Sequence, residues 1–231
     1  MIRGFKVSMT AFRFRIPASK DVSAVPANRI VQMSGRENFM SFCLPTTRLI
    51  LDDLTAADLT NIQAIARDPD FRKYVLIWLD TDKQIRAFLQ HAIDEAEKKE
   101  GRLDYVLAAR DRATREFAGL TFIEIDPAQE STAEVGIVLL PTFCRNGYGS
   151  EILREFLRFG FETLGMHRVY GKCDELNIPS ARMMEKCGLV YEGTIREHVW
   201  LRDHWRSTRY YGMLAGEFAA GSHNSSRDPR A

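Results

Sequence analysis

Residues 141–156, "PTFCRNGYGSEILREF", join an apolar run to an amphipathic helix through a short turn that contains two glycines. Gly147 and Gly149 let the backbone approach another group closely, because a glycine has no side chain to obstruct it. The helix that follows presents unpaired N–H groups and a partial positive charge at its N-terminus. A turn of this kind suits an anion, most often a phosphate, although a plain tight turn has a similar composition.

The composition indicates one globular domain with an extension at each end. The chain has 231 residues, of which 45% are hydrophobic and 27% are charged, and its formal net charge is +1. This balance gives no indication of nucleic acid or an acidic membrane surface as a partner, so a phosphate would need a local site. No apolar run approaches the roughly 18 residues of a membrane-spanning helix, and we expect a soluble, cytoplasmic protein.

The cysteines and histidines show no spacing that is typical of a metal site or a disulfide framework. The four cysteines are Cys43, Cys144, Cys173 and Cys187, and no two of them form a C-x-x-C pair. The five histidines are equally scattered. We therefore expect free thiols and no metal.

The two ends of the chain differ from its middle. Residues 1–44 are basic and show no clean periodicity, which predicts a poorly ordered extension; a targeting peptide, or a start at Met33 or Met40, are the alternatives. Residues 219–231 are small and polar, which predicts a disordered tail. The folded domain is expected to span residues 45–218.

Hydrophobic periodicity and capping residues predict an alternation of strands and helices between these ends. Thr55 is the expected cap of the first helix, Asp80 or Thr81 that of the second, and Gly101 is expected to end the second helix. The expected elements are strand 47–54, helices 55–68 and 82–100, strands 104–111, 116–126 and 133–141, the helix after the glycine turn, strand 167–174, helix 177–188, and strands 189–201 and 206–218. The order β-α-α-β-β-β-α-β-α-β-β predicts an α/β (α+β) fold, a mixed and mostly antiparallel sheet flanked by helices.

The chain resembles the GNAT superfamily of N-acetyltransferases, and within it the Rim-type group of ribosomal-protein N-terminal acetyltransferases. The resemblance covers roughly residues 46–218 and rests on residues 133–153, 177–197 and 201–214. The second stretch is the most specific, since it matches the pattern N-x-x-S-x-R-x-x-E-K-x-G at Asn177, Ser180, Arg182, Glu185, Lys186 and Gly188.

The resemblance implies that acetyl-CoA is the co-substrate and that backbone amides of the glycine turn surround its pyrophosphate. Cys144 departs from the usual first residue of the family's Q/R-x-x-G-x-G/A motif, but backbone shape should matter more there than side chains. A backbone N–H late in the preceding strand would serve as the oxyanion donor. The implied cofactor-binding residues are Val138, Leu139, Leu140, Cys144, Arg145, Asn146, Gly147, Tyr148, Gly149, Ser150, Asn177 and Ser180.

Acetyl transfer also needs a proton acceptor for the amine and a donor for the leaving thiolate. Glu134 is the first candidate for the base, followed by Glu197 and His198. The resemblance places Ser180 near the coenzyme sulfur, where its hydroxyl could donate to the thiolate. Each residue also has a structural interpretation: a cross-strand contact for Glu134, surface or packing roles for Glu197 and His198, and a helix cap for Ser180.

The sequence therefore predicts an enzyme, an acetyl-CoA-dependent N-acetyltransferase. The acceptor would be a primary amine, either a protein N-terminal α-amine or a small amine, which attacks the thioester directly. The alternative is a catalytically silent GNAT-like module that binds acyl-CoA as a sensor or scaffold. A late strand at a sheet edge would also suit a homodimer.

Overall fold

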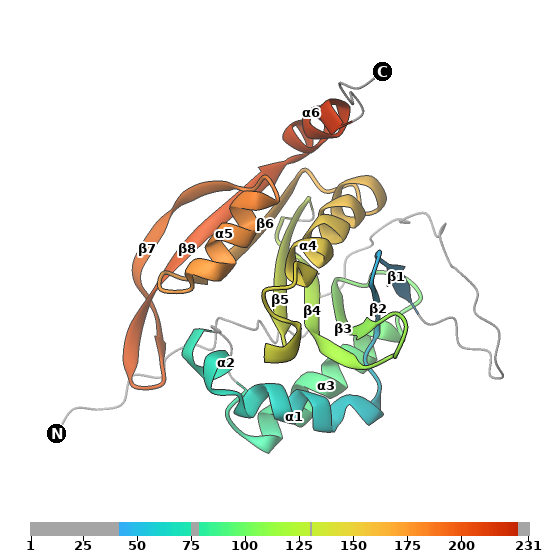
Figure 1. Ribbon diagram of the computed structural model, residues 1–231, viewed down its shortest axis with the longest axis vertical. Coiled ribbons are helices and arrows are strands. Elements are labelled where there is room, and N and C mark those ends of the chain that lie inside the picture. Colours follow the sequence, from blue (N-terminus) through green and yellow to red (C-terminus); the bar gives the residue numbers. More distant parts are fainter. Residues whose placement is uncertain (1–41, 75–78, 130, 226–231) are drawn as a thin grey trace.

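The computed structural model describes residues 42–74, 79–129 and 131–225 (Figure 1). Within these residues the chain forms an eight-stranded sheet with the strand order β1-β2-β3-β4-β5-β6-β8-β7. Positions 1–41 of the predicted N-terminal extension and 226–231 of the predicted tail lie outside the described residues. No helix in the described ranges is both long and apolar enough to span a bilayer.

The elements follow the predicted order, with three additions. The strands are β1 (Cys43–Pro45), β2 (Leu49–Asp53), β3 (Asp104–Asp111), β4 (Phe117–Ile125), β5 (Thr132–Leu139), β6 (Arg168–Asp174), β7 (Val190–Leu201) and β8 (His204–Leu214). The helices are α1 (Leu59–Arg67), α2 (Pro69–Tyr74), α3 (Asp82–Ala96), α4 (Tyr148–Arg158), α5 (Ile178–Lys186) and α6 (Ala215–Ser225). Strand β1, helix α2 and helix α6 have no counterpart among the expected elements.

The pairing of the strands confirms the predicted mixed sheet. Strands β3, β4 and β5 form the expected antiparallel meander, and all other neighbours are antiparallel except β5 and β6. Helices α1 to α3 lie on one side of the sheet and α4 and α5 on the other (Figure 1). The fold is therefore a sheet between two layers of helices.

Each face of the sheet has its own hydrophobic core, because successive strand residues point to opposite faces. On β3, Val106 and Ala108 pack with buried residues of α1 and α3, whereas Leu107 packs with those of α4 and α5. The same alternation places Leu120, Phe122 and Val138 on the α1–α3 face, whereas Phe117 and Ala118, beside a shift of the β3–β4 register, have the opposite parity.

Two expectations about helix ends have different outcomes. Thr81 caps α3 as predicted, and its side chain accepts a hydrogen bond from the N–H of Gln84 at 3.3 Å. The prediction for Gly101 is wrong, since α3 ends at Ala96 and Gly101 lies in the connection to β3. Its φ of +68° accounts for the glycine there without a helix end. Helix α6 continues through residues 219–225, where the sequence predicts disorder.

The pairing between β5 and β6 is short, and this opens the sheet. The parallel register runs from Thr132 opposite Arg168 to Val135 opposite Gly171. Beyond it, residues 136–139 remain paired with β4, and residues 172–174 remain paired with β8. We call the segment where these residues no longer pair with each other the β5–β6 opening.

The close contact between β4 and β5 predicts that Gly119→Ala is strongly destabilising. A Cβ at Gly119 would lie 2.1 Å from the carbonyl oxygen of Val138 and 2.9 Å from the Cα of Leu139. Because backbone atoms cannot rotate away, we expect the free energy of unfolding, measured by urea titration, to fall by about 2–3 kcal/mol. Gly216→Ala in α6 is the control, since nothing lies within 4 Å of its added Cβ. An equal effect of the two substitutions would contradict this explanation.

Candidate active site

The turn between β5 and α4 has the backbone shape of an anion site. Arg145 and Gly147 both have positive φ angles, +62° and +81°, and Gly147 is the N-cap of α4. A helical hydrogen bond joins the N–H of Glu151 to the carbonyl of Gly147 at 3.1 Å. The N–H groups of residues 148–150 lie before this bond, at the N-terminus of the helix. Turn residues 144–147 are exposed. Successive N–H groups in such a turn form a concavity that binds anions.

A side chain that the sequence analysis did not single out, Arg48, contacts this turn. Its Nη1 donates to the carbonyl of Asn146 at 2.9 Å, and its Nε donates to Glu151 Oε2 at 2.7 Å. Its guanidinium carbon lies 4.0 Å from the ring centroid of Tyr148. Burial alone would raise the pKa of Glu151, but hydrogen bonds from Thr46 and Arg48 lower it below its ordinary value. The β1–β2 connection is thereby tied to the start of α4.

Gly149 allows two helices to approach each other. A Cβ at this position would lie 2.7 Å from the sulfur of Met183 in α5. The space left by its missing side chain therefore faces the neighbouring helix. The two glycines of the turn have different roles, since Gly147 provides the left-handed backbone and Gly149 the contact between α4 and α5.

The start of α5 carries the two residues that the family pattern implicates in cofactor binding. Asn177 is the N-cap of α5, and its Oδ1 accepts a hydrogen bond from the N–H of Ser180 at 3.2 Å. The Ser180 side chain acts on the thiol of Cys173 and lowers its pKa, an effect that burial outweighs. Burial raises the pKa of Cys173 to about 11, so this thiol is neutral near pH 7. Asn177, and not Ser180, is thus the residue that caps the helix.

The predicted oxyanion donors lie on the part of β5 that borders the opening. The N–H of Leu140 donates to the carbonyl of Ala118 at 2.9 Å, on the β4 side. N–H groups alternate between the two edges of a strand, so that of Val138 also points toward β4. The N–H groups of Ile137 and Leu139 therefore point toward the β5–β6 opening. Of the three residues named from the sequence, Leu139 has the suitable direction, and Ile137 was missed.

Glu134 lies where the pairing of β5 and β6 ends. Its carboxylate accepts hydrogen bonds from the Tyr170 hydroxyl at 3.0 Å and from Lys172 Nζ at 2.8 Å. Burial alone would lower the pKa of Lys172, but the Glu134 carboxylate raises it above its ordinary value. The ion pair joins the two strands just before they separate.

Glu134 is the last of three carboxylates that lie side by side across the sheet. In the register of the meander, Glu124 on β4 is directly opposite both Asp104 on β3 and Glu134 on β5. Asp104 is 2.6 Å from His91 Nε2, and Glu134 is bonded to Lys172. Among the described residues, the carboxylate of Glu124 has no hydrogen-bond or ion-pair partner. Burial, and then the charges of Asp104 and Glu134, raise the pKa of Glu124 to about 7.

Glu124 is absent from the candidates chosen by sequence, although a signal for it existed. The hairpins of the meander can be aligned from the alternation of apolar residues, and that alignment places Glu124 opposite Glu134. Like charges directly opposite each other destabilise a sheet, so such a pair indicates a special environment.

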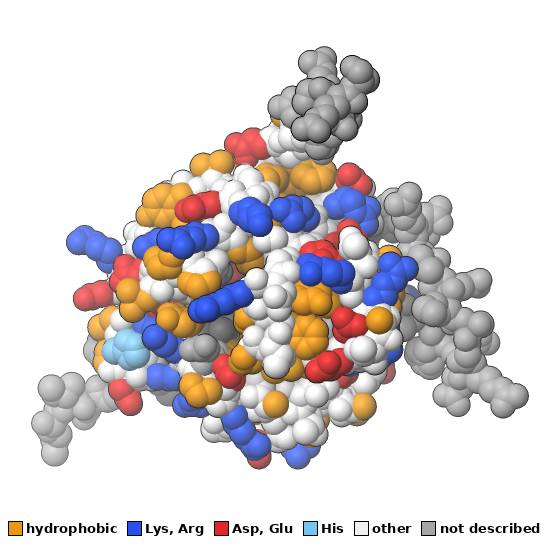
Figure 2. Space-filling view, in the orientation of Figure 1, with side chains coloured by type: hydrophobic (Ala, Val, Ile, Leu, Met, Phe, Trp, Pro, Cys, Tyr) orange, Lys and Arg blue, Asp and Glu red, His pale blue; other side chains and the backbone are white. Residues whose placement is uncertain are grey.

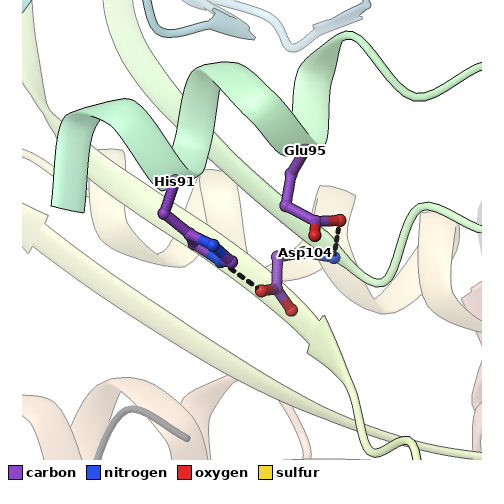
Figure 3. A group of neighbouring side chains, drawn as sticks. All are labelled: His91, Glu95 and Asp104. Atoms are coloured by element: carbon purple, nitrogen blue, oxygen red, sulfur yellow. Dashed lines mark hydrogen bonds and ion pairs between the residues drawn. The ribbon is translucent and has the colours of Figure 1, made fainter. Parts of the chain in front are cut away.

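His91, Glu95 and Asp104 form a compact group between α3 and β3 (Figure 3). Their ligand-type atoms lie within 4.8 Å of one another. Glu95 accepts a hydrogen bond from the N–H of Leu103 at 3.3 Å and forms an ion pair with Lys98. The hydrogen bond to Asp104 raises the pKa of His91. These contacts account for the group as a link between helix and strand.

The two remaining candidates on β7 differ in their surroundings. His198 Nδ1 lies 3.1 Å from the Thr208 hydroxyl, and burial, followed by the charge of Lys172, lowers its pKa. Its ring also contacts Tyr210, which is paired with Lys172 in the sheet. Glu197 is exposed in an irregular part of β7. The structure therefore brings His198 toward the Glu134–Lys172 pair and leaves Glu197 at the surface.

Comparison with known proteins gives the chain a family. Residues 48–190 match the model of the acetyltransferase (GNAT) domain. An uncharacterized N-acetyltransferase of Bacillus subtilis, YnaD, is 27% identical over 176 residues, which are 76% of this chain and 98% of that protein.

Two solved structures illustrate the shared fold. Spermidine N-acetyltransferase from Vibrio cholerae, in complex with CoA and spermine, aligns with a TM-score of 0.64 at 19% identity, over 75% of this chain and 99% of that one. RimL, a ribosomal L7/L12 alpha-N-protein acetyltransferase, aligns with a TM-score of 0.67 at 18% identity, over 79% of this chain and 99% of that one.

The left-handed residues of the turn predict opposite effects of two substitutions. Arg145→Gly should raise the free energy of unfolding by about 1 kcal/mol, because glycine adopts positive φ without strain. Gly147→Ala should lower it by about 1–2 kcal/mol for the same reason. Asn146→Gly is the control, since Asn146 is not among the positive-φ residues and glycine there should destabilise slightly. Urea titration measures all three, and a loss of stability in Arg145→Gly would contradict the assignment.

Proposed function

The chain belongs to the GNAT acetyltransferase family, and from this premise we propose that it transfers the acetyl group of acetyl-CoA to a primary amine by direct attack on the thioester. The observation that carries the proposal is the turn of residues 144–150 beside the β5–β6 opening. One feature suits the pyrophosphate of acetyl-CoA, and the other gives its thioester access to the middle of the sheet.

The residues of the turn fit a pyrophosphate in shape and in charge. The exposed turn, with its left-handed Gly147, leads into the N-terminus of α4, which favours an anion. Lys and Arg side chains gather over α4 and α5 (Figure 2). Arg154 and Lys186 belong to this surface, and their charges act on Cys187 between the two helices. A polyphosphate would meet a local cationic field although the chain as a whole is nearly neutral.

For the thioester we assign two kinds of donor. The N–H of Leu139, which points toward the opening, would stabilise the oxyanion that forms on the acetyl carbonyl. The Ser180 hydroxyl would donate to the sulfur as the carbon–sulfur bond breaks. Asn177 would hold the start of α5 in position for this. Acetyl-CoA itself supplies the activated acetyl group.

For the acceptor amine we assign the opposite face of the sheet, where α1 to α3 lie. The carboxylate row and the Glu134–Lys172 pair are on this face, at the end of the opening. The two substrates would then meet at the opening from opposite sides. This arrangement brings the amine to the thioester without a covalent enzyme intermediate.

We assign to Glu124 the role of the general base that accepts the proton of the amine. Glu134 is assigned a positioning role. Two donors, the Tyr170 hydroxyl and Lys172 Nζ, already bond Glu134 Oε2, so this carboxylate is engaged in joining β5 to β6. Glu124 has no such partners among the described residues, and its pKa of about 7 suits a general base. This differs from the sequence interpretation, which ranks Glu134 first.

The proposed reaction is balanced in protons and electrons. The ammonium group of the substrate gives one proton to the Glu124 carboxylate, and the lone pair of its nitrogen attacks the carbonyl carbon of the thioester. The carbon–sulfur bond then breaks, its electron pair stays on sulfur, and the second proton of nitrogen goes to the thiolate. The products are the amide, CoA with a free thiol, and one proton released to solvent.

Two observations bear on the acceptor. The pattern at residues 177–188 supports membership of the Rim-type group, for which a protein N-terminal α-amine would be the acceptor. RimL is described as an α-N-protein acetyltransferase, whereas the Vibrio cholerae enzyme is described with spermine bound. We therefore propose a primary amine of either kind, a protein N-terminus or a small polyamine.

A screen of acceptors tests the proposed function. Release of the CoA thiol from acetyl-CoA would be measured with spermidine, putrescine and a heptapeptide that begins with serine. We expect turnover with at least one of them, and none with the N-acetylated form of the same compound. Binding of CoA without turnover of any primary amine would contradict the enzyme and favour a silent module.

The pKa of Glu124 predicts the pH dependence of the reaction. A base must be deprotonated, so kcat/KM should rise tenfold per pH unit below about pH 7 and level off above it. In Glu124→Gln the amine must bind already neutral, so kcat/KM should keep rising above pH 7 toward the pKa of the amine. For an amine with a pKa of about 10, only about one molecule in 300 is neutral at pH 7.5, so we expect a loss of about 300-fold there.

Glu116→Gln is the matched control, because Glu116 is exposed before β4 and the substitution removes the same charge. Its pH profile should equal that of the parent. If Glu124→Gln keeps the plateau above pH 7, another group accepts the proton, and His198 and Glu134 become the candidates to test in the same way.

A further inference from the structure

Arg48 contacts the glycine turn at three successive places. Its guanidinium bonds the carbonyl of Asn146, lies over the ring of Tyr148 and bonds the carboxylate of Glu151. Its backbone N–H also donates to Glu151 Oε1 at 2.6 Å. These contacts join residues about 100 positions apart in the chain, from the β1–β2 connection to α4. The arginine is therefore anchored at both its backbone and its side chain.

The first consequence concerns the shape of the turn. Asn146 lies between Arg145 and Gly147, the two residues with positive φ. A non-glycine residue in that conformation is strained and persists when its surroundings hold it. The bond from Arg48 Nη1 fixes the peptide between the two left-handed residues. Without it, the turn would have more freedom to relax, and its N–H groups would lose their common direction.

The second consequence concerns charge. Glu151 lies in the first turn of α4, directly after the N–H groups that would face a pyrophosphate. A free carboxylate at this place would repel the phosphates. Arg48 bonds Oε2 through Nε, while Thr46 and the Arg48 N–H bond Oε1, so both oxygens are occupied. The ion pair removes the repulsion and keeps the carboxylate turned toward the β1–β2 connection.

We propose that Arg48 is a positioning residue for acetyl-CoA, which holds the turn in its anion-binding shape and neutralises Glu151 so that the pyrophosphate can bind. This inference rests on the proposed function, because it takes the turn as the pyrophosphate site. It assigns to the β1–β2 connection a part in donor recognition. Arg48 acts on the donor through the turn and does not touch the reacting atoms.

The role is specific for one end of the donor, and this makes it testable. Acetyl-pantetheine carries the same thioester as acetyl-CoA but has no pyrophosphate. A residue that prepares the pyrophosphate site should matter for acetyl-CoA and not for acetyl-pantetheine. A residue that only supports the fold should affect both donors equally.

The experiment compares kcat/KM for the two donors at a fixed concentration of the best acceptor from the screen. In Arg48→Gln we expect kcat/KM for acetyl-CoA to fall by about tenfold or more, mainly through KM, with no change for acetyl-pantetheine. Arg48→Lys should restore only part of the loss, because an ammonium group keeps the charge beside Glu151 but lacks the planar fork with which Arg48 bonds Asn146 and Glu151 at once. Arg112→Gln is the matched control, since Arg112 is exposed and donates to the carbonyl of Thr46 at 3.3 Å without touching the turn.

A double-mutant cycle with Glu151→Gln tests the electrostatic part. Glu151→Gln alone should have a small effect on acetyl-CoA, since it removes a bond and a repulsive charge together. Arg48→Gln combined with Glu151→Gln should lose less than Arg48→Gln alone, because no unpaired carboxylate remains beside the phosphates.

Two results would overturn the inference. One is an equal loss with both donors in Arg48→Gln, and the other is full rescue by Arg48→Lys together with additive effects in the cycle. A failure of the proposed function has a different signature, because the parent protein itself would then use acetyl-CoA no better than acetyl-pantetheine. That result would overturn both.

Discussion

The short pairing of β5 and β6 is the constraint on which the rest of the molecule depends. The two strands share a parallel register only up to Val135 and Gly171, and each then stays with its other neighbour. The edge of β5 that carries the N–H groups of Ile137 and Leu139 is thereby no longer paired with β6. A continuous sheet would satisfy these groups and leave no place at its centre for a reaction between two molecules.

The charges of the site are arranged around the end of that pairing. The two outer carboxylates of the row each have a basic partner: Lys172 bonds Glu134, and His91 bonds Asp104. These contacts explain why the two acidic residues are tolerated there. Glu124, between them, forms no ion pair among the described residues, although the charges of Lys172 and His91 act on it from a distance. The network thus contains carboxylates that are engaged in ion pairs and one, Glu124, whose pKa of about 7 lets it gain and lose a proton near neutral pH.

The sequence was sufficient for those parts of the structure that depend on local patterns. The order of the elements, the meander, the cap at Thr81 and the turn at Gly147 follow from periodicity and from residue types within a few positions. Arg48 and Glu151 were not predicted as partners because their contact depends on how β2 and α4 come together across the fold. Glu124 was missed for a related reason, since its environment depends on three strands and not on its own neighbours in sequence.

The turn also has a consequence for how such proteins change over time. Its proposed interactions with a ligand come from the backbone, and Arg145 shows that a left-handed position can be occupied by a residue other than glycine. Side chains at positions 144 to 146 can therefore drift while the shape of the turn is inherited. A signature written in amino-acid letters would fade faster here than the site itself, and relatives whose turns have no recognisable glycine pattern would be found by their shape.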